Sequence, residues 1–493
     1  MSEWKEFYAA LGKAMPRGWD PEATARSPLA RWAQPDEVNV PEWRWQPDGS
    51  TVLLGTYGNN LIGRVNDDRH IVTVAGSRAG KGRSLILPNL ATWPGSVVAI
   101  DPKGELAAKT ARWRSEGLKQ HVVVLDPYGV SGFKSGAYNP LSDLDPKAVT
   151  FLDDVSMIAD ALIVDDPRDR HWTDAAKNLI RTLILYMYVT GGEISLPRMR
   201  RMMMGAEGPL SGIGGEAEDK ERDTDNLFLN MASHKDAFGG FLRLLALTFL
   251  EKAPRELGSI LSTAREQTVV LDSPTMASVL KESSLRLRSI KRRPTTVYMC
   301  LPAARLATHF RWLRIIVNLT LAALEDPFIP KHPTLLLLEE FAVLGHMEAI
   351  EKAAGQIAGF GVKLWTVLQD LGQLKSTYKE RWETFMGNAG VTTWFGLNDL
   401  TSLEYVSNRL GDTHFTRMEK VDLTMGQRGQ GSAEYRETVV NTKLLSPEEV
   451  GRMFARETGR ALILHPGSRP LVLQRLDASN AMFRGKIDGE QRT

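Results

Sequence analysis

The chain has 493 residues, of which 43% are hydrophobic and 24% are charged, and this balance is typical of a soluble globular protein with two or three domains. The net charge of +2 excludes a general electrostatic affinity for nucleic acid, so any basic surface has to be local. The single cysteine, Cys300, excludes internal disulfides and lies in an apolar run that predicts a core strand.

The first 50 residues are rich in tryptophan and proline, which predicts an irregular arm that docks on a domain or on a neighbouring molecule. Residues 51–69 predict a β-hairpin with its turn at Gly58-Asn59. The chain has no uninterrupted apolar run of about 18 residues and no basic-then-apolar start. We therefore expect no signal peptide and no membrane span of its own.

The stretch from His70 to Leu90 combines an apolar strand, a glycine-containing loop and a helix that begins near Lys81. In this order, backbone N–H groups and the helix N-terminus surround phosphates, while the lysine neutralises their charge. An ordinary glycine-rich turn between a strand and a helix is the alternative interpretation. The candidate phosphate-binding residues are Gly76, Ser77, Arg78, Ala79, Gly80, Lys81, Gly82 and Arg83.

The phosphate-loop pattern G-x-x-x-x-G-K-[ST] is matched imperfectly. Gly80 and Lys81 supply its last two fixed positions. Ala75 stands where the first glycine belongs, and Gly82 stands where a Mg²⁺-binding hydroxyl belongs.

Further apolar runs, separated by helical patterns, predict a mainly parallel sheet buried on both faces and hence an α/β fold. Ligands of such sheets bind at the carboxyl ends of the strands. Four runs end in polar residues, which together suggest a site around the loop. The runs are 96–101, 121–126, 296–301, 334–340, 363–369 and 391–396, and the polar ends are Asp101, Asp126, Glu339 with Glu340, and Gln369.

Helical periodicity replaces the strand pattern between Asn139 and about Glu282, which predicts an all-α insertion in the sheet domain. Within the insertion, residues 208–225 predict an exposed mobile loop, with a linker of no function as the alternative. Far beyond the insertion, residues 424–437 predict no regular structure. The expected domains are an arm (1–50), a first motor part (51–140), the insertion (141–282), a second motor part (283–480) and a tail (481–493).

The glutamates after the leucine run have the form of a Walker B strand. Glu339 would hold Mg²⁺ through its water shell, and Glu340 would orient the attacking water and accept its proton. Gln369, at the end of the next strand, could report the γ-phosphate. Two glutamates at a strand end are also common as solvated surface, but the buried leucines before them favour the catalytic interpretation.

A basic cluster lies where the helical insertion returns to the sheet, and it is the candidate for local contact with DNA phosphates. A solvated positive face with no role in DNA binding is an equal alternative. The cluster consists of Arg286, Arg288, Lys291, Arg292 and Arg293.

An ordered set of motifs resembles the type IV secretion coupling proteins, the TraG/TraD-like conjugative ATPases that are related to FtsK- and HerA-type DNA motors. The resemblance covers roughly residues 50 to 475. Its motifs are AGSRAGKG, ATWPGSVVAIDPKGE, VVVLDPYG, YNPL, LLLLEEFAVLG, LQDLGQL, WETFMGNAG, FGLNDLTSLEYVS and KLLSPEEV.

The resemblance implies a RecA-like P-loop motor domain with an inserted all-α domain, ATP and Mg²⁺ as cofactors, and a homo-hexameric ring. It implies single-stranded DNA with its relaxase as substrate, which the ring would move, and type IV secretion channel proteins as partners. On this basis Lys81 is the Walker lysine, Glu339 and Glu340 take the place of the usual Asp-Glu pair, and Gln369 is the glutamine of the third motif.

The chain departs from the family in three respects. Glu339 replaces aspartate, no arginine occurs between His346 and Gly361 to serve as an arginine finger, and the usual transmembrane helices are absent. We expect a membrane-free branch or a membrane-anchored partner, with the protein in the cytoplasm or peripheral at the inner membrane. Ala75, Gly82 and Glu339 favour the alternative function, a nucleotide-binding docking adaptor that hydrolyses little.

Overall fold

The computed structural model describes residues 30–47, 51–65, 67–165, 169–205, 226–420 and 435–489. The chain divides into two compact units. The first unit comprises Met1–Trp93, Trp365–Arg484 and Arg492–Thr493, and the second comprises Pro94–Leu364 and Gly485–Gln491. The predicted loop 208–225, residues 424–434 and the first 29 residues of the predicted arm lie outside the described residues.

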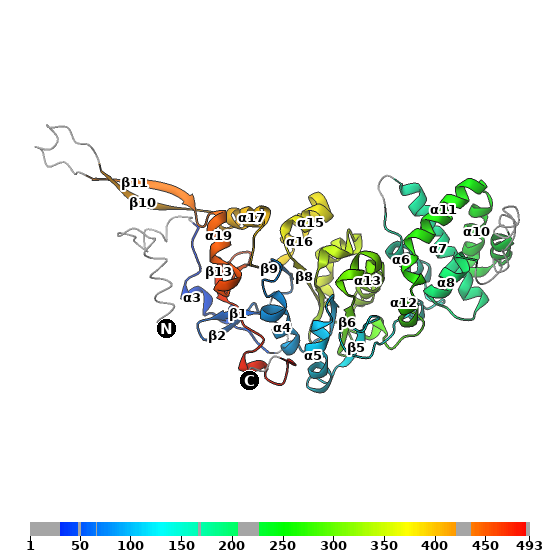
Figure 1. Ribbon diagram of the computed structural model, residues 1–493, viewed down its shortest axis with the longest axis horizontal. Helices are drawn as coiled ribbons and strands as arrows, with labels where there is room; N and C mark the ends of the chain where they lie inside the picture. Colours follow the sequence, from blue (N-terminus) through cyan, green and yellow to red (C-terminus); the bar gives the residue numbers. More distant parts are fainter. Residues whose placement is uncertain are drawn as a thin grey trace, which may run out of the picture. The chain divides into compact units, whose positions relative to one another are not determined.

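The first unit contains strands in the order β2-β1-β13-β12-β9-β3, followed by β8 from Trp365 onward; Figure 1 labels β1, β2, β8, β9 and β13. β3 pairs in parallel with β9 and β8, whereas the strands from β12 to β2 pair antiparallel. β3 is buried at all six positions, which explains why its sequence is apolar without alternation. The strands are β1 (Leu53–Tyr57), β2 (Asn60–Gly63), β3 (His70–Ala75), β8 (Val362–Leu368), β9 (Ala389–Phe395), β12 (Arg460–Leu464) and β13 (Leu471–Gln474).

The hairpin β1–β2 is confirmed, and it helps to fix the helix that follows the phosphate loop. That helix, α4 (Leu87–Thr92), carries the buried Asn89. The Asn89 amide accepts from the Leu53 backbone N–H at 2.7 Å and donates to the Leu53 carbonyl at 2.8 Å. Asn89 thus gives β1 the two hydrogen bonds that a neighbouring strand would give. The other helices of this unit are α3 (Pro35–Val38), α15 (Leu371–Tyr378), α16 (Glu383–Gly387), α17 (Leu400–Leu410) and α19 (Pro447–Met453).

The described part of the predicted arm docks on the first unit. Trp32 and Trp43 are buried. Trp32 packs edge-on against Phe454, and Trp43 packs edge-on against His465. These contacts agree with the prediction that tryptophans in this segment find a surface.

A hairpin that the sequence did not predict, β10 (Asp412–Lys420) with β11 (Tyr435–Lys443), extends away from α17 and α19 (Figure 1). All nine residues of β10 pair with residues of β11, from Asp412 with Lys443 to Lys420 with Tyr435. β11 covers the last three positions of the segment for which no regular structure was predicted, and it continues into a threonine- and valine-rich stretch typical of strands.

The second unit contains strands in the order β7-β4-β6-β5, and all of these pairs are parallel. β4, β6 and β7 are buried at every position, and Cys300 lies in β6 as predicted. The predicted strands of both units are therefore confirmed to within two residues at their ends. The strands are β4 (Val97–Asp101), β5 (His121–Leu125), β6 (Thr295–Cys300) and β7 (Thr334–Leu338), and the flanking helices are α5 (Glu105–Glu116), α13 (Ala303–Leu324) and α14 (Glu348–Gln356).

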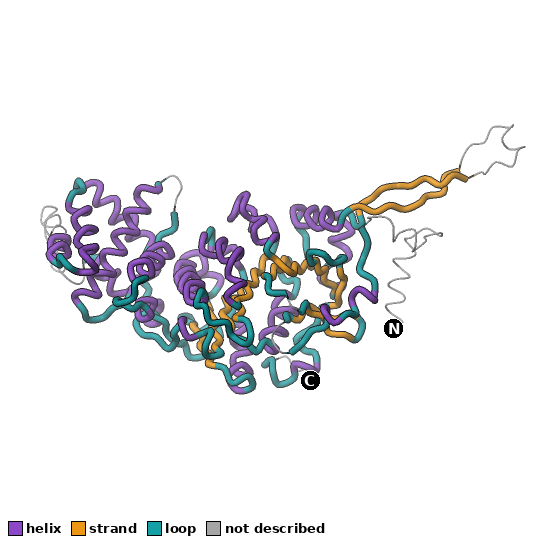
Figure 2. Tube along the Cα trace, turned by 180° about the vertical axis from the view of Figure 1, so that it is seen from behind, coloured by secondary structure: helices purple, strands orange, loops and turns teal. Residues whose placement is uncertain are grey.

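Between β5 and β6 the described residues form helices and no strand, as predicted for the insertion (Figure 2). α7 is the central helix, and it packs against α6, α8, α10 and α11. The helices are α6 (Phe151–Leu162), α7 (Arg170–Thr190), α8 (Leu196–Met203), α10 (Phe241–Leu250), α11 (Pro254–Gln267) and α12 (Pro274–Val279).

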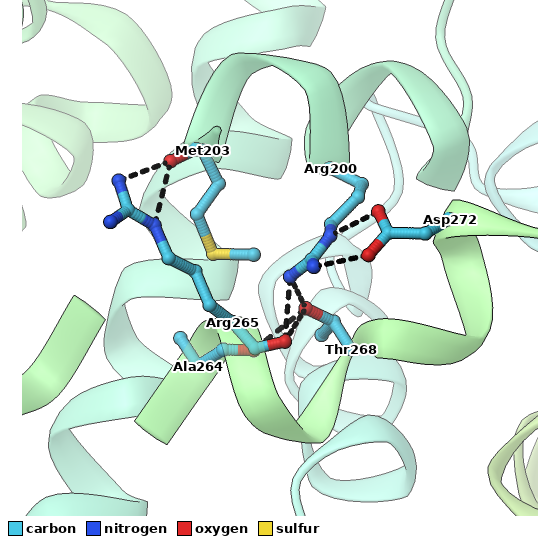
Figure 3. A network of polar contacts seen from close by, with 6 residues as sticks. All are labelled: Arg200, Met203, Ala264, Arg265, Thr268 and Asp272. Atoms are coloured by element: carbon cyan, nitrogen blue, oxygen red, sulfur yellow. Dashed lines mark hydrogen bonds and ion pairs between the residues drawn. The ribbon is translucent and has the colours of Figure 1, made fainter. Parts of the chain in front are cut away.

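A buried arginine fixes the end of α8 to the end of α11 (Figure 3). Arg200 is 4% exposed, and its guanidinium donates to both carboxylate oxygens of Asp272. It also donates to the Thr268 hydroxyl at 2.8 Å and to the Arg265 carbonyl at 2.7 Å. Because four acceptors meet this one guanidinium, its burial leaves little unsatisfied hydrogen-bonding capacity.

Candidate functional site

The candidate phosphate loop leaves the carboxyl end of β3 in the first unit. Val74 pairs with Leu368 of β8, and Ala75 pairs with Phe395 of β9. The loop therefore begins between two parallel strands, at the edge of the sheet where such folds bind ligands. Lys81 has helical backbone angles and directly precedes a π-helical turn, Gly82–Ile86, that leads into α4. The predicted order of strand, loop and helix is confirmed.

Left-handed backbone conformations shape this loop. Arg78 has φ 58° and Gly80 has φ 92°. The Ala79 N–H donates to the Gly76 carbonyl at 3.1 Å, and the Ser84 N–H donates to the Gly80 carbonyl at 2.8 Å. Alternation of left- and right-handed residues turns successive N–H groups toward one concave side, which is the form of an anion-binding nest. The loop thus has positive-φ residues of the kind that anion-binding loops use.

The glycines of the loop differ in what they require. A Cβ on Gly76 would lie 2.1 Å from the Gly396 carbonyl oxygen, so this position has no room for a side chain. A Cβ on Gly82 would meet nothing within 4 Å. The missing hydroxyl at position 82 is therefore a property of the sequence and is not imposed by packing.

Arg83, a predicted phosphate ligand, is held by another residue. Its guanidinium donates to both carboxylate oxygens of Asp477, at 2.7 and 3.1 Å. Burial would raise the pKa of Asp477, but hydrogen bonds from Arg83 and Ser479 outweigh it and hold the pKa at about 2. The Ala478 N–H also donates to the Arg83 carbonyl at 3.0 Å. Arg83 therefore fixes the C-terminal segment to the start of the helix.

Arg475, which the sequence did not single out, lies directly against the loop. Its Nη1 donates to the carbonyl oxygen of Ala79, and its guanidinium carbon lies 4.7 Å from the centre of the Phe395 ring. Burial lowers the pKa of Arg475. No phosphate-loop pattern includes this position, and only the tertiary structure brings it here.

Gln369 is the first residue beyond β8, and Val74 pairs with Leu368. Gln369 therefore lies beside Ala75, where the loop begins. The structure brings this predicted residue and the phosphate loop together within the first unit. Asp370, the next residue, caps α15 by accepting the Gln373 N–H at 2.8 Å.

Glu339 and Glu340 belong to the second unit, at the carboxyl end of the fully buried β7. Both are partly exposed. Glu340 has left-handed backbone angles, φ 52° and ψ 41°, which a non-glycine residue adopts only at a cost of about 1–2 kcal/mol. The buried Arg314 fixes the loop that follows by donating to the carbonyls of Leu344 and His346, each at 2.8 Å. A strained residue held by a supported loop is a frequent property of functional sites.

The aspartates at the ends of β4 and β5 serve the fold. Asp101 is 1% exposed and accepts the Ala107 N–H of α5 at 2.8 Å. Asp126 accepts the N–H groups of Val130 and Ser131, at 3.1 and 2.7 Å, and so closes the loop that follows β5. The sequence correctly predicted both carboxylates at strand ends. Asp126 accepts hydrogen bonds from its own loop, so its carboxylate holds the loop closed.

The predicted basic cluster is not a uniform positive surface. Lys291 is 5% exposed and its amine donates to the carbonyls of Leu324 and Asp326, so its prediction as a surface cation is wrong. Burial lowers the pKa of Lys291. In the other four positions the guanidinium is exposed: Arg288 pairs with Asp154 and Arg292 pairs with Asp326, whereas Arg286 and Arg293 have no ion pair within the described residues.

Parallel strands, a lysine-bearing loop that leads into a helix, and a helical insertion define a RecA-like α/β protein of the P-loop class. The chain belongs to the family of type IV secretory system conjugative DNA transfer proteins, whose model matches residues 34–477. The resemblance noted in the sequence is thereby confirmed. Across the described residues, no helix combines the length and the apolar character needed to cross a membrane.

In sequence the chain is similar to conjugal transfer proteins and to the protein VirD4. It is 29% identical over 468 residues to the conjugal transfer protein TraG of Escherichia coli, covering 86% of this chain and 70% of the relative. It is 25% identical over 475 residues to the protein VirD4 of Rhizobium radiobacter, covering 91% and 63%. The chain thus spans about two thirds of the length of these relatives.

The fold is that of solved coupling-protein structures. The bacterial conjugative coupling protein TrwBΔN70 matches with a TM-score of 0.65 at 13% identity, covering 94% of this chain and 96% of that one. TrwB in complex with ADP and Mg²⁺ matches with a TM-score of 0.63 at 14% identity, covering 91% and 95%. At this level of identity the likeness establishes the fold.

Proposed function

We propose that this protein is an ATP-driven coupling protein that recruits a relaxase–DNA or protein substrate to a type IV secretion channel and powers DNA translocation. The single observation that carries the proposal is the turn from left-handed Gly80 into helical Lys81 at the end of β3, in a member of the conjugative DNA transfer family. A turn of this kind directs backbone N–H groups toward an anion, and Lys81 would add a cation beside them.

In the proposed reaction, water attacks the γ-phosphorus of ATP and ADP leaves. Lys81 neutralises charge on the β- and γ-phosphates, and the loop N–H groups orient them. Bound Mg²⁺, held through water by Glu339, would neutralise further phosphate charge. Glu340 orients the attacking water and accepts its proton, and Gln369 responds to the γ-phosphate beside the loop.

TrwB has been solved with ADPNP and with ADP and Mg²⁺, which supports ATP and Mg²⁺ as the ligands here. We further propose a homo-hexameric ring acting on single-stranded DNA, peripheral at the inner membrane through a membrane-anchored partner. Arg286 and Arg293 are the candidate phosphate contacts of the basic cluster, since both are exposed and neither forms an ion pair within the described residues, unlike Arg288 and Arg292.

A second function, a nucleotide-binding adaptor with little hydrolysis, is favoured by one specific observation. Gly82 supplies no hydroxyl to a Mg²⁺ ion, although a Cβ would fit there. Ala75 and Glu339 also depart from the pattern expected of an efficient ATPase. Both functions require nucleotide binding, but only the coupling ATPase hydrolyses ATP efficiently.

A DNA-stimulated ATPase assay on the purified chain separates them, with Lys81→Ala as the matched variant. A coupling ATPase should hydrolyse ATP faster when single-stranded DNA is added. Loss of the lysine should lower the rate on the order of 10³-fold without unfolding the protein. An adaptor would bind ATP with no DNA-dependent turnover. A Lys81→Ala variant that retains the wild-type rate would disprove the assignment of the site.

A further inference from the structure

Arg475 links three segments of the first unit at the phosphate loop. It follows β13 directly, and its Nη1 donates to the Ala79 carbonyl while its Nη2 donates to the Arg456 carbonyl. The guanidinium carbon lies over the Phe395 ring, 4.7 Å from its centre. A Cβ placed on Gly80 would lie 3.6 Å from Nη1, so the cation reaches the middle of the loop.

The contact with Ala79 determines the orientation of one peptide group. None of the described peptide bonds is cis, so the carbonyl of Ala79 and the N–H of Gly80 point in opposite directions across their shared plane. With the carbonyl held toward Arg475, the Gly80 N–H is directed to the other side of the loop. Gly80 has φ 92°, which glycine adopts freely, so the orientation costs little.

We infer that Arg475 is a positioning residue of the phosphate site, which holds the Ala79–Gly80 peptide so that the Gly80 N–H faces the bound phosphate. The inference rests on the proposed function, because it concerns the same site. It assigns a role in di- and triphosphate binding to a residue outside the loop itself.

The positive charge of Arg475 strengthens this arrangement. Within the described residues no carboxylate forms an ion pair with it, and its Nε is buried without a hydrogen-bond partner. A partly buried guanidinium on the carbonyl side polarises the peptide, which makes the N–H on the other side a stronger donor. The unpaired charge also adds to the positive potential at the loop.

The residues that follow hold the other end of the loop. Asp477 accepts hydrogen bonds from Nε and Nη2 of Arg83, and the Ala478 N–H donates to the Arg83 carbonyl. The segment 475–478 therefore contacts the loop at Ala79 and again at Arg83. The two contacts limit how far the intervening Gly80–Gly82 stretch can open.

The test measures the binding of ADP and of inorganic pyrophosphate to the full chain in the presence of Mg²⁺. The variants are Arg475→Met, which keeps the apolar stem, and Arg475→Lys, which keeps the charge and has a single donor nitrogen. Arg452→Met is the matched control, since Arg452 is exposed on α19. Melting temperatures are measured without ligand. Hydrogen–deuterium exchange of the peptide that covers residues 76–84 is compared with and without pyrophosphate.

We expect Arg475→Met to bind both probes at least roughly tenfold more weakly, equivalent to about 1.4 kcal/mol, and to lose the slowing of exchange that pyrophosphate causes in the wild type. Arg475→Lys should recover part of both effects, and Arg452→Met should change neither. If Arg475→Met does not fold, Arg475→Lys decides: intermediate affinity with a wild-type melting temperature supports the inference.

Two other results overturn the inference, and they differ in what else they overturn. Wild-type binding and wild-type exchange protection in a folded Arg475→Met protein, while Lys81→Ala binds neither probe, would disprove the role of Arg475 and leave the site in place. Absence of binding by the wild type, or equal binding by Lys81→Ala, would disprove the phosphate site and the inference together.

Discussion

Asp101 and Glu339 lie side by side at the carboxyl ends of two paired strands, because Ile100 of β4 and Leu338 of β7 are partners in register. The two acidic residues have different surroundings. Asp101 is almost fully buried and accepts a backbone N–H of α5, whereas Glu339 is partly exposed. One end of the sheet therefore carries a carboxylate that fixes a helix next to one that can serve a ligand.

The buried carboxylate should make stability depend on pH. Burial raises the pKa of Asp101 to about 6. The native state therefore retains a proton that the unfolded chain releases near pH 4. Binding of this proton stabilises the native state at low pH, and the stabilisation is lost as the pH rises through about 6. Asp101→Asn cannot lose a proton. The free energy of unfolding of this variant, relative to that of the wild type, should rise by on the order of 2–3 kcal/mol between about pH 4 and pH 7. Above about pH 7 the difference should stay constant.

Melting temperatures of both nucleotide-free proteins across this range provide the measurement for Asp101. Groups other than Asp101 cancel in the difference between the two proteins. A difference that is flat with pH would mean that Asp101 is already ionised well below pH 6.

Replacement of Glu339 and of Glu340 by glutamine should have different effects on nucleotide trapping. Glu340→Gln should bind ATP with Mg²⁺ and trap it, because the base is lost while Glu339 still holds the metal's water shell. Filter binding of labelled nucleotide after a chase gives the measurement. Trapping by Glu339→Gln alone would show that the two roles are exchanged.

The backbone at position 340 allows an independent test. Glycine adopts φ 52° without the cost that glutamate bears. Glu340→Gly should therefore abolish turnover while the melting temperature stays equal or rises. A marked fall in melting temperature would indicate that the Glu340 side chain stabilises the fold, against a purely functional role.

Replacement of Gly82 by serine should be tolerated and should improve the metal site. A Cβ at position 82 meets no atom within 4 Å, so the hydroxyl can be added without a clash. We expect Gly82→Ser to bind ADP at a lower Mg²⁺ concentration than the wild type, by roughly threefold or more. Gly80→Ala is the contrasting variant: its left-handed backbone penalises alanine, and nucleotide binding should weaken.

Within the basic cluster, only Arg286 and Arg293, which form no ion pair within the described residues, should contribute to DNA binding. Arg286→Ala combined with Arg293→Ala should reduce the salt slope of single-strand binding by roughly 1.4, at about 0.7 per lost phosphate contact. Anisotropy of a labelled oligonucleotide between about 50 and 200 mM salt measures it. Lys291→Ala should instead lower the melting temperature, because its buried amine donates to the carbonyls of Leu324 and Asp326. An unchanged slope in the double variant would place the DNA path elsewhere.

Local sequence was sufficient where local chemistry determines the structure. The strands were predictable because a parallel sheet buried on both faces requires continuous apolar runs, and the loop was predictable because Gly80 and Lys81 occupy fixed spacings. The direction of a long side chain was not predictable: Lys291 and Arg293 look alike in sequence, yet one is buried and the other exposed. The hydrogen bonds of Asp126 depend on the loop geometry that follows β5.

Arg475 could not be predicted at all, since it touches Ala79 across 396 positions of the chain. That separation has a consequence for synthesis. At about 5–20 residues per second, a ribosome completes the phosphate loop tens of seconds before it adds Arg475. If Arg475 positions the loop, a nascent or prematurely terminated chain would carry the whole phosphate-loop motif and still bind nucleotide poorly. Nucleotide binding would then reach its full affinity only when translation has passed β13 and added Arg475.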